Sequence, residues 1–113
     1  MSSNADSKKL KASRVIAWVE SNPQVEQLFE RHALAEVNAG RKFGGNAIAE
    51  RVRWYDLVST SGEPVKIPND AVPLLVRRLV AKHPDARPYV TLRRSMFDAL
   101  GEDSRAKAYG AVH

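Results

Sequence analysis

Glycine and proline residues interrupt this chain at intervals that leave room for short helices. Pro23, Gly40 and Pro84 mark such breaks, and the neighbours Gly44 and Gly45 mark another. Proline fits the first turn of a helix and ends a helix that precedes it, whereas glycine favours helix exits and tight turns. Apolar residues between the breaks recur at helical spacing. The sequence therefore predicts a mainly α-helical fold with a small β component.

Helices are predicted over residues 7–20, 23–40, 47–58 and 70–82. Two of them follow residues that cap helix N-termini well: Asn22 and Asn69. The clearest buried stripe lies in the last helix and consists of Val72, Leu75, Val76 and Leu79. The opposite side of that helix is expected to carry Arg77, Arg78 and Lys82.

The remaining segments are predicted to be short or irregular. Residues 64–67 and 88–95 have the pattern of short extended segments, and residues 95–100 that of a short final helix. Residues 1–6 are small and polar, and we expect them to be disordered.

Composition bounds the class of protein. The 113 residues fit one domain, and the 43% that are hydrophobic allow a modest core. The absence of cysteine excludes disulfides, thiolate metal sites and a thiol nucleophile. No apolar run approaches the roughly 18 residues of a membrane span. Residues 1–11 are polar and lack the apolar region of a signal peptide. We expect a cytoplasmic protein with no membrane partner.

The chain has an excess of positive charge, which is concentrated in its middle. It has 18 Lys and Arg against 13 Asp and Glu, a formal net charge of +5. Residues 41–94 contain eleven of these basic residues and five of the acids, whereas basic and acidic residues balance over residues 1–40. A basic surface attracts polyanions, so nucleic acid is the first partner to consider. The alternative is a solvated basic face that only keeps a small protein soluble.

Catalytic and cofactor motifs are absent from the sequence. Gly40 and Gly45 have the spacing of a phosphate-binding loop, but Asn46 and Ala47 stand where that loop needs Lys and then Ser or Thr. The histidines are isolated, so no pair of them is spaced to bind a metal on a helix. No serine lies in a nucleophile-elbow motif. We expect no enzymatic activity, no cofactor and no metal.

Basic side chains recur along the predicted helices and extended segments of the middle region. A helix of about 13 residues fits the major groove of DNA, where exposed Arg side chains bond phosphates or guanine edges. N–H groups at a helix N-terminus also contact phosphates. The alternative is a three-helix core whose polar faces happen to use arginine. The candidate DNA-binding residues are Arg51, Arg53, Lys66, Asn69, Arg77, Arg78, Lys82, Arg93 and Arg94.

From about Leu28 to Ser95, the chain resembles a family of small uncharacterised bacterial and phage proteins. The stretches that carry the resemblance are Leu28-Phe29-Glu30, Ala33-Leu34, Ala47-Ile48, Arg51-Val52-Arg53-Trp54, Lys66-Ile67, Arg77-Arg78-Leu79, Lys82-His83-Pro84 and Leu92-Arg93-Arg94-Ser95. Members are considered similar to winged helix-turn-helix domains. The resemblance implies a winged helix-turn-helix-like three-helix core, which we expect over residues 23–100. Residues 1–22 are expected to form an N-terminal arm with a short helix, and residues 101–113 a flexible tail because that end of the chain lacks periodicity. It also implies a phage or prophage origin, which would place the protein in the host cytoplasm.

Two function hypotheses of different classes follow. The first is a small DNA-binding accessory or regulatory protein that contacts duplex DNA through the basic helix over residues 70–82 and flanking strands. Changing Arg77 and Arg78 to alanine is then expected to weaken binding without unfolding the domain. The alternative is a protein-interaction module that binds and modulates a host protein through Trp18 or Trp54, although we expect Trp54 to pack in the core. The partial apolar stripe of residues 7–20 leaves room for a homodimer contact.

Overall fold

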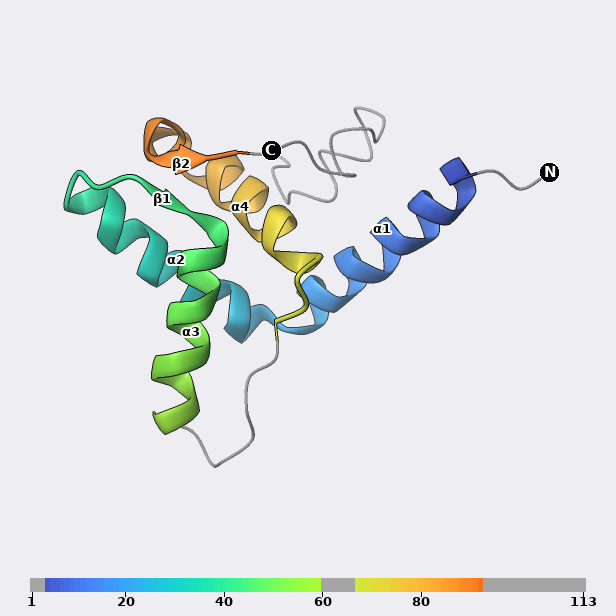
Figure 1. The fold of residues 1–113 in the computed structure, drawn as a ribbon, viewed down its shortest axis with the longest axis horizontal. Coiled ribbons are helices and arrows are strands. Elements are labelled where there is room, and N and C mark those ends of the chain that lie inside the picture. The colour runs from blue at the N-terminus through green and yellow to red at the C-terminus, as the bar shows by residue number, and fades with distance from the viewer. Residues whose placement is uncertain (1–3, 60–66, 93–113) are drawn as a thin grey trace.

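The computed structural model describes residues 4–59 and 67–92, with side chains over residues 10–54 and 67–92. Its α-helices are α1 (Asn4–Ser21), α2 (Pro23–Asn38), α3 (Gly45–Ser59) and α4 (Ala71–Lys82). A 3₁₀ helix follows α4, and two short strands complete the described fold: η1 (Pro84–Tyr89), β1 (Phe43–Gly44) and β2 (Val90–Thr91). The prediction of a mainly α-helical fold with a small β component is confirmed (Figure 1).

Helix α4 lies at the centre of the described fold, with α1, α2, α3 and η1 packed against it. Its predicted apolar stripe is buried, as expected. Because neighbours cover more than one side of α4, burial extends beyond the stripe to Leu74 and to the side chain of Arg77. Apolar side chains from the other helices complete the core, among them Val15, Val19, Val25, Phe29, Ile48 and Val52.

Helix α1 is longer than predicted. It begins at Asn4, so the expectation of disorder over residues 1–6 is wrong for residues 4–6. The small residue Ala12 belongs to its buried stripe, together with Val15 and Val19. Leu10, an apolar residue of the same helix, has 58% of its surface exposed. Because α1 packs on α4 through these residues, it shares one core with the rest of the described chain.

The junctions around α2 are formed by backbone and amide hydrogen bonds. Asn22 was predicted to cap α2, but its side chain makes no capping bond there. The Asn22 Nδ2 group instead donates to the carbonyl oxygen of Trp18 at 2.7 Å, which closes the end of α1. Gly40, the predicted exit of α2, has φ +72°, a left-handed conformation that glycine adopts at little cost. The helix is therefore terminated as its glycine predicted.

The two strands form a small parallel sheet, with Phe43 opposite Val90 and Gly44 opposite Thr91. The strand predicted over residues 88–95 is wrong at its start, because Pro88 lies inside the 3₁₀ helix that precedes β2. Residues 93–95 lie outside the described part, as do residues 64–66 and the predicted helix and tail over residues 95–113.

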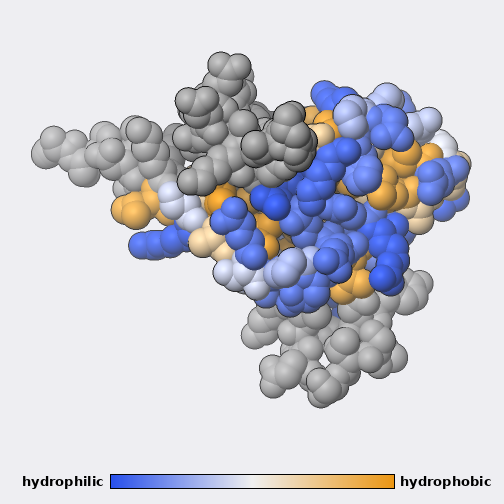
Figure 2. Space-filling model, turned by 180° about the vertical axis from the view of Figure 1, so that it is seen from behind, coloured by the Kyte–Doolittle hydropathy of each residue, from blue (hydrophilic) through white to orange (hydrophobic). Residues whose placement is uncertain are grey.

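Large apolar side chains are exposed at separate points of the described surface: Leu10 and Trp54. On the face shown in Figure 2, hydrophilic residues predominate and apolar ones form separate patches. The expectation that Trp54 packs in the core is wrong, because 71% of its surface is exposed. It follows the buried Val52 by two residues, which places it about 200° around the helix from the core. No helix in the described part combines the length and apolar character that a membrane span needs.

Candidate functional site

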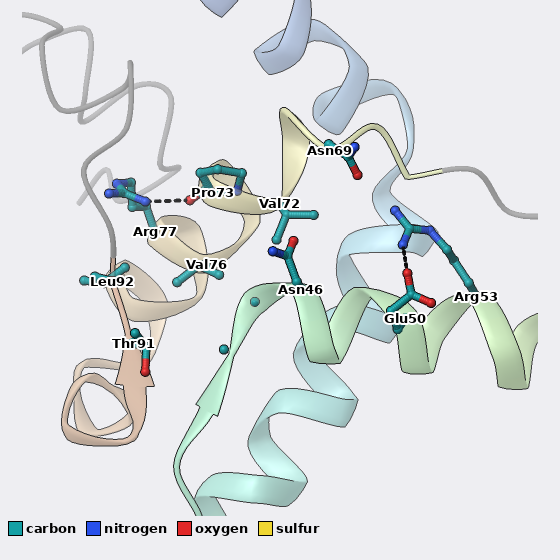
Figure 3. A pocket seen from close by; sticks show the side chains of 12 residues that line it. Asn46, Glu50, Arg53, Asn69, Val72, Pro73, Val76, Arg77, Thr91 and Leu92 are labelled. Atoms are coloured by element: carbon teal, nitrogen blue, oxygen red, sulfur yellow. Dashed lines mark hydrogen bonds and ion pairs between the residues drawn. The ribbon is translucent and has the colours of Figure 1, made fainter.

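A cleft of about 620 Å³ opens between α3, α4 and β2 (Figure 3). Its walls come from segments that are far apart in the sequence: the start of α3, the segment before α4, the first half of α4, and β2. Guanidinium and amide groups dominate its polar lining, with one carboxylate among them. The lining residues are Gly44, Gly45, Asn46, Glu50, Arg53, Asn69, Val72, Pro73, Val76, Arg77, Thr91 and Leu92.

Helix α3 supplies one wall of the cleft through its residue spacing. Asn46, Glu50 and Arg53 follow one another by four and then three positions, so their side chains lie on the same face of the helix. Of these three, only Arg53 was predicted as a site residue. The spacing of the other two was visible in the sequence, but nothing local distinguished that face from an ordinary solvated one.

Gly45 brings this wall close to α4. A Cβ atom at Gly45 would lie 2.5 Å from Cγ2 of Val76 and 2.8 Å from Cγ1 of Val72. These distances are far below an ordinary carbon–carbon contact. The missing side chain therefore allows the start of α3 to approach α4, and this approach sets the width of the cleft.

Two arginines of the cleft are held by backbone carbonyls. Arg53 pairs with Glu50, and its Nη2 donates to the carbonyl oxygen of Ile67 at 2.7 Å, which ties α3 to the segment before α4. Arg77 donates from Nη1 to the carbonyl oxygen of Pro73 at 3.1 Å. Arg77 was expected on the exposed side of its helix, but its residue is only 8% exposed. Both guanidinium groups are therefore positioned at the cleft wall.

The cleft also contains two exposed amide side chains. In Figure 3, Asn46 points from α3 toward α4, and Asn69 points back from the segment before α4. Neither amide forms a hydrogen bond within the part of the chain that the structure describes. Each offers both N–H donors and a carbonyl acceptor. These groups can therefore bond a ligand without giving up a partner in the protein.

The C-terminal half of α4 makes a different contact. Arg78 forms two bonds to Glu26 of α2, from Nε to Oε2 at 2.6 Å and from Nη2 to Oε1 at 3.1 Å. Lys82 bonds the same carboxylate at 2.9 Å and that of Glu30 at 2.7 Å. The side chains of Arg78 and Glu26 are only 11% and 9% exposed. These cations join α4 to α2 and do not line the cleft.

A third glutamate of α2, Glu36, pairs with another of the predicted site residues, Arg51. Arg51 lies 3.4 Å from Glu36, and Arg41 approaches the same carboxylate at 2.7 Å. The structure therefore gathers Arg53, Asn69 and Arg77 at the cleft and places Arg51, Arg78 and Lys82 against glutamates of α2. The other predicted site residues lie outside the described part: Lys66, Arg93 and Arg94.

The exposed cations that form no ion pair within the described residues lie elsewhere: Arg14, Arg31, Lys42 and Arg87. Two of them, Lys42 and Arg87, lie in the segments that lead into the two strands. Because Phe43 lies opposite Val90 in parallel strands, Lys42 and Arg87 stand near the same end of the strand pair. Neither residue was predicted as a site residue, since their placement at one end of the strand pair depends on strands that are far apart in the chain.

No family model, curated protein or solved structure matches the chain. The resemblance to small bacterial and phage proteins therefore stays a prediction, and the site rests on its geometry. Within the described residues, no group of three or more histidine, aspartate or glutamate side chains is placed to hold a metal ion.

The glutamates of α2 are tuned by their cationic partners. Hydrogen bonds from Arg41 lower the pKa of Glu36 to about 2. Burial acts in the opposite direction, and the hydrogen bond from Arg51 lowers the pKa further. Burial by itself raises the pKa of Glu26, but the bonds from Arg78 and Lys82 outweigh it and leave that pKa below its ordinary value. Both carboxylates are therefore charged near neutral pH and hold their cations.

We expect these carboxylates to make the fold sensitive to acid. A carboxylate with a lowered pKa in the folded state contributes stability above its unfolded pKa, and this stability is lost as the pH falls. For Glu36 the loss runs from about pH 4.5 down to about pH 2. Urea unfolding across this range should show a midpoint that falls less steeply in Glu36→Gln than in the unchanged protein. Glu20→Gln is the control, because Glu20 is exposed and unpaired within the described residues. Equal slopes in all three proteins would contradict the prediction.

Proposed function

We propose that this protein is a small nucleic-acid-binding module that contacts its ligand through the cleft between α3 and α4. The observation that carries the proposal is the presence at one open cleft of two exposed amides, Asn46 and Asn69, that form no side-chain hydrogen bond within the described residues. Amide side chains bond base edges, and guanidinium groups bond phosphates and guanine. The duplex DNA hypothesis, with its winged-helix-like architecture and regulatory role, is one form of this proposal.

The charge distribution supports the same conclusion. The chain has a net charge of +5. Exposed cations outside the ion pairs, such as Lys42 and Arg87, leave a positive field that attracts a polyanion. The proposed contact surface is the cleft, because the side-chain amides of Asn46 and Asn69 form no hydrogen bond within the described residues. In the C-terminal half of α4, by contrast, Arg78 and Lys82 bond Glu26.

The proposal is tested by the affinity for labelled oligonucleotides. Changing Asn46 and Asn69 together to alanine should weaken binding by more than about 5-fold, because each lost base contact is worth about 1–3 kcal/mol, or about 5- to 150-fold. Asn38→Ala is the matched control, since Asn38 is an exposed amide at the end of α2, outside the cleft. Fluorescence anisotropy at low and at moderate salt measures both changes. Absence of binding at low salt to single-stranded and to duplex probes would overturn the proposal.

A second candidate function is the protein-interaction module, which the exposure of Trp54 favours. Tryptophan and arginine are common anchors of protein interfaces, and Trp54 follows Arg53 directly. A host protein that is retained after nuclease treatment, and lost with Trp54→Ala, would support this function. The cleft amides and the excess of cations are not needed for such an interface, which is why nucleic acid is the first proposal.

A further inference from the structure

Trp54 lies next to the face of α3 that lines the cleft. It follows Glu50 by four residues and Asn46 by eight, which are the spacings of side chains on one helix face. Arg53, which precedes it in the chain, lines the cleft, whereas Trp54 is not among the lining residues. The opposite side of α3 is packed in the core through Ile48 and Val52. The exposed surface of α3 therefore carries an amide where it lines the cleft and an indole eight residues further along the helix.

The exposed indole of Trp54 offers an aromatic face on which an aromatic or apolar part of a ligand can pack. A tryptophan side chain buries more apolar area than almost any other when it packs, yet Trp54 remains 71% exposed. Its neighbour along the chain, Arg53, lines the cleft and pairs there with Glu50. Proteins that bind single-stranded nucleic acid combine cations along the backbone with exposed aromatic side chains on which bases stack.

We infer that the ligand of the cleft is a single-stranded nucleic acid with one base stacked on Trp54, an inference that rests on the proposed function. Base faces are free in a single strand, whereas in a duplex they are covered by the neighbouring pairs, so an indole on a convex helix surface stacks only on the former. The eight-residue separation from Asn46 to Trp54 spans about 12 Å along α3. At the roughly 3.4 Å spacing of stacked nucleotides, this corresponds to about four nucleotides.

The test compares a single-stranded probe with a duplex. The single strand is an oligodeoxythymidylate of about 12 nucleotides, which does not pair with itself, and the duplex is a blunt one of the same length. We expect the unchanged protein to bind the single strand more than about 10-fold more tightly than the duplex. Loss of one base stack by Trp54→Ala should weaken binding of the single strand by about 5- to 150-fold. Trp54→Phe keeps an aromatic face and should restore part of the affinity.

Leu10→Ala is the matched control, because Leu10 is the other large hydrophobic side chain exposed in the described part and lies on α1. Thermal unfolding checks that the variants remain folded, which we expect at such exposed positions. A Trp18→Phe background leaves Trp54 as the single tryptophan, so that its fluorescence quenching reports stacking directly.

The possible outcomes distinguish a failure of the single-strand inference from a failure of the proposed function. Duplex binding that equals or exceeds single-strand binding, and that Trp54→Ala leaves unchanged, overturns the single-strand inference and leaves the proposed function standing. Absence of binding to both probes overturns the proposed function itself. Self-association that is lost with Trp54→Ala, while oligonucleotide affinity stays the same, shows that Trp54 contacts protein and overturns the stacking role.

Discussion

Replacing Arg78 by alanine is expected to lower the free energy of unfolding by about 3 kcal/mol, because it breaks a buried ion pair. The guanidinium makes two bonds to Glu26, and both side chains are almost fully removed from solvent. Without Arg78, that carboxylate keeps only its bond to Lys82. The sequence-based prediction, that changing Arg77 and Arg78 does not unfold the domain, did not include this loss of stability, because it placed both side chains on the exposed side of the helix.

Urea denaturation of the variant measures the loss. Arg31→Ala is the control, because Arg31 is exposed and unpaired within the described residues, and a surface change of this kind costs less than about 0.5 kcal/mol. Replacing Glu26 and Arg78 together with apolar residues of similar size should recover much of the stability, since no buried charge is then left without its partner. Equal midpoints for Arg78→Ala and Arg31→Ala would show that the pair contributes nothing.

The second large effect is expected at Gly45. Changing it to alanine should cost about 1–3 kcal/mol, because the added Cβ would overlap the methyl groups of Val72 and Val76. Valine side chains in a helix are restricted to one main rotamer, so these methyl groups cannot turn away. The better helix propensity of alanine, worth up to about 1 kcal/mol, does not offset an overlap on two sides.

The neighbouring glycine provides the control. A Cβ at Gly44 would meet nothing within 4 Å, so Gly44→Ala should leave the unfolding free energy nearly unchanged. Combining Gly45→Ala with Val76→Ala removes one of the overlapping methyl groups, although it also removes buried apolar surface. The double variant should therefore lose less unfolding free energy than the two single variants lose in total. A Gly45→Ala protein as stable as the Gly44→Ala protein would show that α3 moves away from α4 without cost.

Several features followed from the sequence alone because they depend on neighbours along the chain. The helices over residues 23–40 and 70–82 were predicted from apolar periodicity and from breaks such as Gly40, which does take the left-handed conformation. The buried stripe of α4 was predicted for the same reason. The positive net charge is a property of composition. The helices and the stripe depend on residue spacing within one segment, and the net charge depends on the number of charged residues. None of them depends on contacts between distant segments.

Only the tertiary structure decided which polar groups are free to act. Arg78 and Glu26 are separated by 52 residues, and they pair because α2 packs beside α4. Trp54 shares its helix with apolar core residues, yet it is 71% exposed because it lies on the side of α3 that faces away from the core. An ion pair between helices depends on how the helices pack against each other, and residue spacing within one helix does not determine that packing. The candidate site therefore became visible only when α3, α4 and the strand pair were assembled.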